Sequence, residues 1–410
     1  MKKLILLFSL IPTLILSQEK KDYVRSSLHL HLVDDFEFEN GDKVLNSYNK
    51  FEFPQNYNDH TIDLNKIKLS DFDLTDEEKA EAGVKNDVVG DLLKSSIQEA
   101  TGGLIKIQDN SFVKLQLEKY ISSEKIAHRL VKKWWMIGDD GSFDRGLVTE
   151  RSLQSKTMEM AAIASASGTG EVDQFNKLIN NTFVVFTRLY FVSNEIWAEI
   201  IRQQAYAVAD GLGGGLPTEL ARKAADKLYQ KQSEGYSVWT TAWLYQLEWD
   251  INVFDMFVTT INDGKIDLEK FDSLDFKLNF LGMDKATSLV SGFSSKEENQ
   301  SIFDLATVRN VDKVLVKLQR EYDVFKPIFP LRENFSVAAG VKEGIEGGET
   351  FEVLETKNGE YNRIGTMKVD KKKVWDNSWT GEEIEPGLTY FKKGNKKFVP
   401  GIHYVRLKNK

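Results

Sequence analysis

The chain has 410 residues, 41% of them hydrophobic, a formal net charge of −8 and no cysteine. This length allows two or three domains of the usual ~100 to 200 residues. The acidic balance argues against nucleic acid or anionic lipid as a general electrostatic partner, and the lack of cysteine excludes disulfides and a lipidated N-terminal cysteine.

Residues 1–17, MKKLILLFSLIPTLILS, have the pattern of a secretory signal peptide, with two lysines before an apolar run. The charged QEKKDY that follows keeps this run below the roughly 20 residues of a membrane helix, and no other segment approaches that length. Removing Lys2 and Lys3 changes the formal charge from −8 to −10. We therefore expect an exported, non-lipidated protein of the periplasm, the outer-membrane surface or the extracellular space, without a transmembrane helix.

Residues 18–86 are polar and predict an extension with a few short edge strands, partly disordered. On such a strand His29 and His31 would face the same side. The sequence shows no third metal ligand at a suitable spacing, so a plain edge strand is favoured over a metal site. The other histidines show no metal-ligand spacing; they are His60, His128 and His403.

Residues 87–326 mix helix and strand patterns. Over 122–135 apolar residues recur every four positions, which predicts an amphipathic helix capped by Ser122 or Ser123. The segment 149–166 shows helical spacing as well and predicts a second helix.

Three segments predict strands. Apolar residues at both parities over 181–192 indicate a central strand covered on both faces. The segment 236–250 is apolar at its odd positions, which indicates one covered face, and 274–282 alternates cleanly. The strands do not alternate regularly with helices, as they would in a βαβ fold. This favours an α+β fold with a mixed or antiparallel sheet and amphipathic helices.

Two helices are predicted over 195–209 and 217–232, joined by a glycine-rich loop at 211–216. This loop lacks the Lys-Ser/Thr of a phosphate-binding loop, so a flexible connector is the favoured interpretation. The alternative is a loop that docks on a partner or a membrane surface through Leu212 and Leu216.

A last helix is predicted over 305–322, and Pro327 and Pro330 predict an interdomain linker after it. Residues 333–410 then show short strands between glycines, which predicts a small all-β barrel- or sandwich-like module. Within the module, 337–355 predicts a strand, a glycine turn and a second strand.

Two acidic segments could mimic cation sites. At 262–271 an EF-hand alignment lacks three oxygen ligands, so we expect a hairpin turn with Asp263 and Gly264 at its tip. The loop 138–146 predicts a solvated turn because nothing in it fixes a coordination number; its carboxylates are Asp139, Asp140 and Asp144.

An aromatic stripe could stack sugars, but at strand periodicity it is more often core; it consists of Trp239, Trp243, Tyr245 and Trp249. The chain contains no HExxH, no GxSxG and no cysteine nucleophile. We therefore assign no catalytic, cofactor-binding or metal residue, and expect no cofactor.

The segment "GLVTERSLQSKTMEM" at 146–160, followed by the strand "NTFVVFTRLYF", resembles the αβ core of the curli-secretion lipoprotein family. The stretches "GVKEGIEGGETFEVLE", "RIGTMKV" and "VWDNS" are similar to the small β domain of flagellar-assembly proteins. More broadly, 120–380 resembles an uncharacterised family of exported proteins of Bacteroidota-type bacteria. The curli-secretion proteins are lipidated and this chain cannot be. Their membrane-spanning strands match no segment here, so the resemblance implies an envelope location and a non-catalytic character, and no site residue.

The leading hypothesis is a non-enzymatic exported protein of the cell envelope that acts through protein contacts, in an assembly or scaffold role. Its partner would be an envelope protein or a second copy. The alternative is a carbohydrate-binding or glycoside-hydrolysing protein that uses the aromatic stripe and two carboxylates about 5 to 9 Å apart. Exposed tryptophans would favour the alternative, and buried ones the leading hypothesis.

Overall fold

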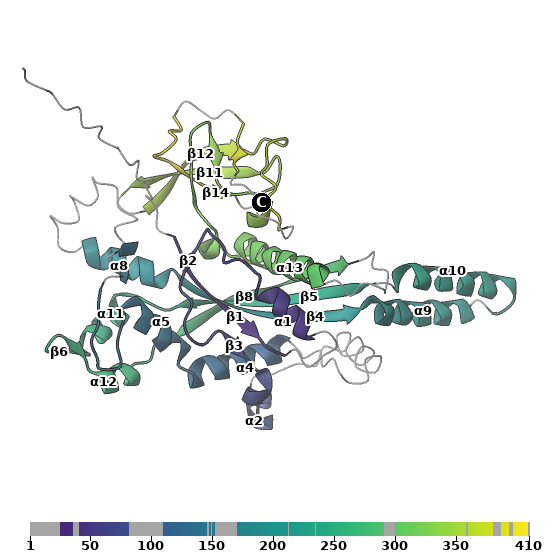
Figure 1. Cartoon of the computed structure of the whole chain (residues 1–410), viewed down its shortest axis with the longest axis horizontal. Helices are drawn as coiled ribbons and strands as arrows, with labels where there is room; N and C mark the ends of the chain where they lie inside the picture. The colour runs from purple at the N-terminus through teal and green to yellow at the C-terminus, as the bar shows by residue number, and fades with distance from the viewer. Residues whose placement is uncertain are drawn as a thin grey trace, which may run out of the picture.

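The computed structural model describes twelve stretches of the chain; they are residues 25–35, 41–81, 110–145, 147–148, 150–151, 170–211, 213–233, 235–290, 300–357, 360–379, 387–392 and 397–408. The predicted signal peptide and most of the predicted helix 149–166 lie outside them. The fold is α+β, as predicted, with a mixed six-stranded sheet and an all-β C-terminal module (Figure 1).

The main sheet has the order β2-β1-β4-β5-β8, with β3 also pairing with β1. Its strands are β1 (Ser27–Val33), β2 (Asn58–Asp59), β3 (Lys66–Ile67), β4 (Thr182–Ser193), β5 (Tyr236–Leu247) and β8 (Leu278–Val290). β1 runs parallel to β4, whereas β4–β5 and β5–β8 are antiparallel. Val184 and Val185 point to opposite faces of β4 and both are buried. The prediction of a central strand is confirmed.

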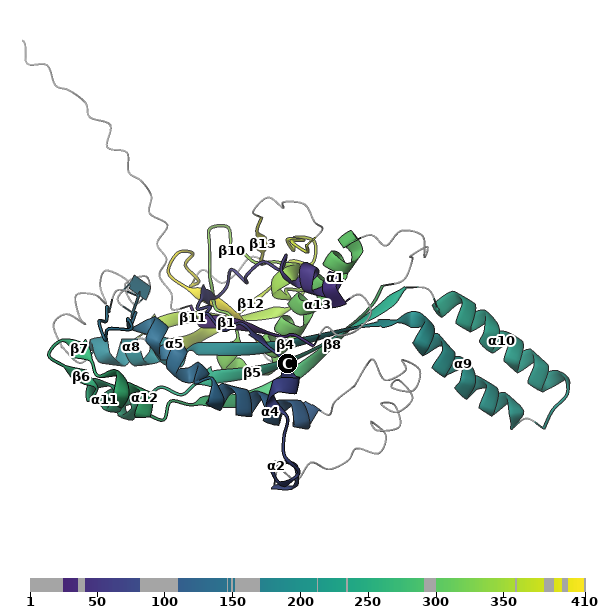
Figure 2. The same cartoon turned by 60° about the horizontal axis from the view of Figure 1, so that its bottom comes forward.

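Helices cover both faces of this sheet (Figures 1 and 2). On one face lie α4 (Asn110–Ser123), α5 (Ile126–Trp134), α8 (Gly170–Asn180), α11 (Ile251–Val258) and α12 (Leu268–Ser273). On the other face lie α1 (Gly41–Tyr48) and the long α13 (Gln300–Glu321). The remaining short elements are η1 (Leu69–Phe72), α2 (Asp76–Glu81), β6 (Ile261–Asn262) and β7 (Lys265–Ile266).

The N-terminal region corrects one prediction. β1 is an interior strand, paired with β4 on one side and with β2 and β3 on the other, so the predicted edge strand is wrong. Leu28 and Leu32 belong to the same hydrophobic core as the buried residues of α13. The strand is short and carries two histidines, and its burial comes from parallel pairing with β4, which local sequence does not show.

Three smaller details also differ from the sequence prediction. β5 is covered on both faces, because Trp243 and Leu244 are both fully buried on opposite sides. α5 has no serine cap: α4 continues through Ser123, and Lys125 enters the helix from a left-handed conformation with φ of 50°. The third strand begins at Leu278.

The turn between β6 and β7 confirms a prediction. Asp263 and Gly264 occupy its tip with φ of 48° and 77°. Two consecutive positive φ values are typical of a tight hairpin turn, and glycine at the second position adopts them without strain.

The C-terminal module contains a four-stranded sheet, with the order β12-β11-β14-β9, and a separate pair, β10-β13. Its strands are β9 (Phe329–Pro330), β10 (Ser336–Val337), β11 (Thr350–Lys357), β12 (Glu360–Lys368), β13 (Thr389–Tyr390) and β14 (Tyr404–Leu407). A separate core fills the module, with Phe351 and Val353 among its buried residues. The described strands do not close into a barrel.

The proline segment is not the accessible linker that the sequence predicted. After α13, η2 (Asp323–Phe325) leads directly into β9, in which Pro330 pairs with Tyr404 of β14. Lys326 and Phe329 are buried. The prolines are tolerated because β9 is at the edge of its sheet, where one side needs no backbone donor. The boundary between the domains at 326–333 stays a prediction.

The glycine stretch 337–355 is also built differently. Between β10 and β11 lies the 3-10 helix η3 (Val341–Glu343), and the chain then turns at Gly344 with φ of 74°. At Gly344 a Cβ atom would lie 2.3 Å from Cγ1 of Val316 on α13, and Arg320 of α13 donates to the Gly344 carbonyl oxygen. This glycine therefore fixes the module against the main domain.

Gly344→Ala should destabilise the protein by more than the roughly 1 kcal/mol that positive φ alone costs, because the added methyl group overlaps Val316. Gly401→Ala is the matched control, since Gly401 has φ of 80° and no atom would lie within 4 Å of a Cβ placed there. Urea unfolding measures both variants. Equal losses of stability would contradict the close contact at Gly344.

Candidate interaction surface

A pair of antiparallel helices projects from the end of the main sheet (Figures 1 and 2). β4 leads into α9 (Asn194–Asp210), and α10 (Leu216–Gln232) leads back to β5. The Ser193 hydroxyl accepts from the Glu195 backbone N–H at the start of α9, and Pro217 lies in the first turn of α10. Both helices were predicted, and we call them together the hairpin.

The glycine loop is the tip of this hairpin. Gly213, Gly214 and Gly215 have φ of 80°, 88° and 76°, values that side chains other than glycine rarely adopt. No atom lies within 4 Å of a Cβ built at Gly213 or Gly214. The loop therefore serves as an exposed connector, and Leu212 lies outside the described residues.

Small side chains form the contact between the two helices. Ala198, Ala209 and Ala225 are buried there, and the Thr218 hydroxyl donates to the Ala209 carbonyl oxygen. Small residues let the helix backbones approach closely. Val208 and Leu220, which are 73% and 58% exposed, therefore contribute little to the contact between the two helices.

One face of the hairpin is polar and internally paired. Tyr206 donates to Asp226, and the Arg202 guanidinium pairs with Glu199 and stacks over Tyr229 at 4.2 Å from the ring centroid. Further along, Arg222 pairs with Asp210 and Tyr229 donates to Glu195. This network satisfies the charged groups of that face.

The opposite face is mainly apolar, with the exposed Gln204 between Ile201 and Val208. At about 100° per residue, Ile201 and Val208 of α9 and Leu220 and Leu228 of α10 fall on the side away from the tyrosines and arginines. The pairing of Thr218 with Ala209 and of Arg202 with Tyr229 places Val208 beside Leu220 and Ile201 beside Leu228. Their exposed fractions are 41% for Ile201, 73% for Val208, 58% for Leu220 and 41% for Leu228. These four residues and the exposed Ala224 are called the apolar face below.

With Leu216, which is 69% exposed, the hairpin holds five of the fourteen large hydrophobic side chains that are exposed among the described residues. Its helices have only 17 residues each. Scattered exposed hydrophobic residues are normal on a soluble protein, but a contiguous group on a projecting element marks an interaction site.

The aromatic stripe, by contrast, is core. Trp243 and Tyr245 are fully buried, and Trp249 is buried with its indole N–H donating to Asn176. Trp239 is half-buried. Trp243, Tyr245 and Trp249 therefore offer no surface on which a sugar could stack.

The histidines of β1 lie in a buried polar cluster. His29 and His31 face the same side, as predicted, with Nε2 of one 3.3 Å from Nδ1 of the other. Desolvation by burial lowers the pKa of His29 to about 4 and, with the neighbouring His29, lowers the pKa of His31 to about 3. His60 is buried too, and desolvation holds its pKa well below its ordinary value. All three are therefore neutral in the folded protein.

Arg151, which belongs to the motif that resembles the curli-secretion proteins, has a structural role. Its guanidinium donates to the Ser27 hydroxyl, to the Asp59 carbonyl oxygen and to Nδ1 of His60, and it stacks on Trp134 at 4.6 Å. Because arginine can only donate, Nδ1 of His60 accepts, and Nε2 donates to a backbone carbonyl. Sequence reasoning missed this cluster, because its members are far apart along the chain.

The two other histidines also make backbone contacts. Nε2 of His128 lies 2.8 Å from the Leu274 carbonyl oxygen, and Nδ1 of His403 accepts from the Val399 N–H. Neither is grouped with other metal ligands. Within the described stretches no cluster of three or more His, Cys, Asp or Glu could hold a metal ion.

The acidic loop forms a turn held by its own contacts. Asp140 accepts from the hydroxyl and the backbone N–H of Ser142, which together with Lys265 hold the pKa of this carboxyl far below its usual range. Asp139 pairs with Lys132. The carboxylates are therefore satisfied without a cation.

EDTA should leave the thermal unfolding midpoint unchanged, because hydrogen bonds and lysines already stabilise the Asp139 and Asp140 carboxylates. Differential scanning fluorimetry with and without the chelator measures this. A fall of several degrees, restored by adding Ca²⁺, would show that an ion binds.

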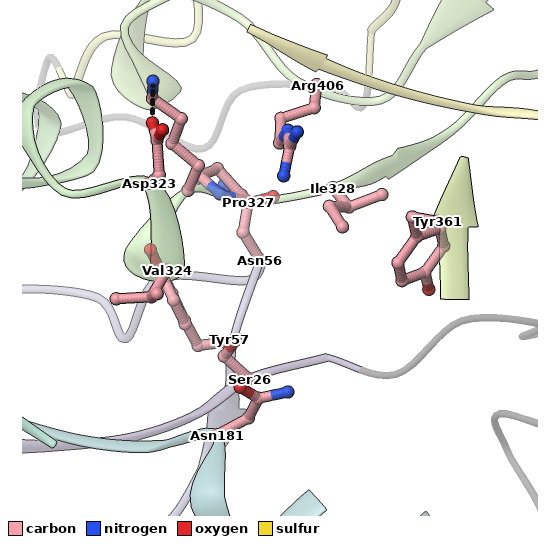
Figure 3. A pocket seen from close by; sticks show the side chains of 11 residues that line it. Ser26, Asn56, Tyr57, Asn181, Asp323, Val324, Pro327, Ile328, Tyr361 and Arg406 are labelled. Carbon is pink, nitrogen blue, oxygen red and sulfur yellow. Dashed lines mark hydrogen bonds and ion pairs between the residues drawn. The ribbon is translucent and has the colours of Figure 1, made fainter. Parts of the chain in front are cut away.

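A cavity of about 170 Å³ lies between the main domain and the module (Figure 3). Asn56 and Asn181 line it from the main domain, and Tyr361 and Arg406 line it from the module. Among the described residues that line it, Asp323 is the only carboxylate; it already pairs with Lys326 at 2.7 Å, while Arg406 pairs with Glu352. The lining therefore lacks the two carboxylates that glycoside hydrolysis needs.

Among the helices of the described stretches, none combines the length and the apolar character required to cross a bilayer. Comparison of the chain with protein-family models, curated proteins and solved structures finds no match. The resemblance to the curli-secretion and flagellar-assembly families therefore stays a prediction from short motifs.

Proposed function

We propose that this chain is an exported, non-enzymatic protein of the cell envelope that acts through contacts, in an assembly or scaffold role, and that the apolar face of the hairpin makes those contacts. The observation that carries the proposal is the position of this face. It projects from the body on two helices that bury Ala198, Ala209 and Ala225, while Val208 and Leu220 are more than half exposed.

The free energy of unfolding gives a physical reason for this interpretation. Exposing Val208 and Leu220 forgoes roughly 1.5 to 3 kcal/mol for each side chain that could have been buried. A helix pair built only for its own stability would turn such residues inward. Their outward position is understandable if another surface covers them.

Two observations argue against the alternative of a carbohydrate-binding or glycoside-hydrolysing protein. Three of its four aromatic residues are buried, and the cavity between the domains supplies a single carboxylate. Export itself rests on the pattern of residues 1–17.

The test compares two double variants in cells that produce the protein. Val208→Glu with Leu220→Glu charges the apolar face, whereas Ile251→Glu with Val258→Glu charges two similarly exposed residues on α11. After cell fractionation, the wild type and the α11 variant should remain with the envelope, and the hairpin variant should move to the soluble fraction. If the hairpin variant stays with the envelope, the apolar face is not the contact surface.

A further inference from the structure

Three exposed lysines lie on the side of α10 that is turned away from α9. Lys223, Lys227 and Lys231 are four residues apart, and all are exposed. In a helix this spacing places them in one row, which by the same geometry lies next to Leu220, Ala224 and Leu228. None of the three lysines pairs with a carboxylate among the described residues.

One acidic residue, Glu219, is exposed four residues before Lys223 and so continues the lysine row, whereas the other acidic residues of the described hairpin lie in the polar network. Glu195, Glu199 and Asp210 of α9 and Asp226 of α10 all belong to the polar network around the tyrosines and arginines. As a result, α10 has a formal charge of +2, from four basic and two acidic residues, although the chain as a whole is at −8. The border of the apolar face on α10 therefore carries three lysines and one glutamate, with a net positive charge.

The size and charge of the apolar face argue against a second copy of this chain as its binding partner. Two helices of 17 residues, each about 25 Å long and 10 Å wide, offer roughly 500 Å² per copy, so a dimer would bury roughly 1,000 Å², below the usual range of stable interfaces. Pairing of two such faces would also bring three lysines from each copy together, with only Glu219 of each copy to offset them.

A bilayer surface with anionic headgroups fits both properties. Two helices lying side by side give a flat apolar face, as in interfacial helices that insert their apolar side to the level of the acyl chains. The lysines at the border would meet phosphate groups. The hairpin extends away from the acidic body, and about 10 Å of physiological buffer screens most of the repulsion between that body and the lipid.

We infer that the apolar face of the hairpin docks on a lipid surface rich in anionic headgroups, with Lys223, Lys227 and Lys231 binding the headgroup phosphates. This inference rests on the proposed function and names the occupant of the same surface. Docking is peripheral: the aliphatic side chains enter the headgroup region and the helices stay parallel to the surface.

The experiment is vesicle flotation with the purified full chain. Vesicles of equal parts phosphatidylglycerol and phosphatidylcholine should carry the protein at low salt, and phosphatidylcholine vesicles should not. Replacing the three lysines by glutamine should weaken binding on the order of 100-fold, and 0.5 M salt should weaken it as well. Val208→Ser with Leu220→Ser should weaken binding by at least roughly 10-fold.

Matched controls separate the face from general charge. Lys66, Lys371 and Lys372 are exposed lysines away from the hairpin, and their replacement by glutamine makes the same change in net charge. This triple variant should float like the wild type. Free inorganic phosphate at millimolar concentration should not compete, because single ions lack the surface that the aliphatic residues enter.

Binding that is equal on both vesicle types, or equally weakened by the control variant, would overturn the inference. The absence of binding to either vesicle would overturn it too. If envelope association in cells still required Val208 and Leu220, the proposed function would stand with a protein occupant. A dimer abolished by the hairpin substitutions would identify a second copy instead.

Discussion

Val185→Asp should yield no folded protein. Val185 lies in the middle of β4, the strand that joins β1 to β5, and it is 0% exposed. A carboxylate there would be unpaired among the core residues Phe183, Leu189 and Leu244, at a cost of several kcal/mol. Because total stabilities are usually about 5 to 15 kcal/mol, we expect insoluble product or a chain without a cooperative thermal transition.

Val208→Asp is the matched control, since it makes the same chemical change at a side chain that is 73% exposed. This variant should be soluble and unfold near the wild-type midpoint. A soluble, cooperatively folded Val185→Asp would contradict the central position of β4.

Acidification from pH 7.5 to pH 5 should reduce the free energy of unfolding by roughly 3 kcal/mol. Burial lowers the pKa of His29 to about 4 and that of His31 to about 3, and it lowers the pKa of His60 as well, whereas each titrates near 6.5 when unfolded. Below pH 6.5 the unfolded chain therefore binds protons at these histidines that the folded chain does not, and the lowered pKa values of His128 and His403 act in the same direction. Stability is complete above that pH and falls as the pH decreases toward 4.

Asp312 on α13 acts in the opposite direction. Desolvation raises its pKa to about 7, so the folded state binds this proton first and gains stability as the pH falls below 7. It offsets part of the histidine effect, and the loss of roughly 3 kcal/mol between pH 7.5 and pH 5 includes this offset.

Urea unfolding at pH 7.5, 6.0 and 5.0 measures this dependence. His31→Phe should make it shallower, because the substitution removes one titrating group and keeps the ring contacts with Tyr120 and Phe186. A free energy of unfolding that stays constant from pH 7.5 to pH 5, or an unchanged slope in His31→Phe, would show that the cluster is not neutral and buried.

The regular elements of the fold could be predicted where the local pattern is strong. Apolar residues at both parities identified β4, and the apolar periodicity identified α5 and α13; α9 and α10 were predicted as two helices on either side of the glycine loop, with Pro217 in the first turn of the second. Tertiary pairing could not be predicted: β1 looks like an edge strand until its parallel partner β4 is known, and the proline segment 327–330 looks open until β14 pairs with it. Both depend on contacts between residues far apart along the chain.

Only part of the candidate interaction surface could be predicted from the sequence. The two helices and their glycine loop were predicted, and Leu216 was named as an exposed contact in the alternative interpretation of the loop. The apolar face was missed, because a helical pattern does not say which side packs. The available signal was the alanine spacing: Ala198, Ala205 and Ala209 share one side of α9, and large aliphatic residues occupy another.

A fluorescent label on the hairpin tests the central claim most directly. The chain has no cysteine, so a single one can be introduced and labelled selectively. Ala224→Cys places an environment-sensitive dye on the apolar face, and Gln230→Cys places it on another side of the same helix, where the residue is also exposed.

Isolated envelope fragments are then added to each labelled protein, and the emission spectrum and the quenching by iodide are recorded. We predict a blue shift and protection from iodide for the dye at position 224, and no change for the dye at position 230. Equal responses at both positions, or no response at 224 while the protein sediments with the envelope, would contradict the assignment of the apolar face as the contact surface.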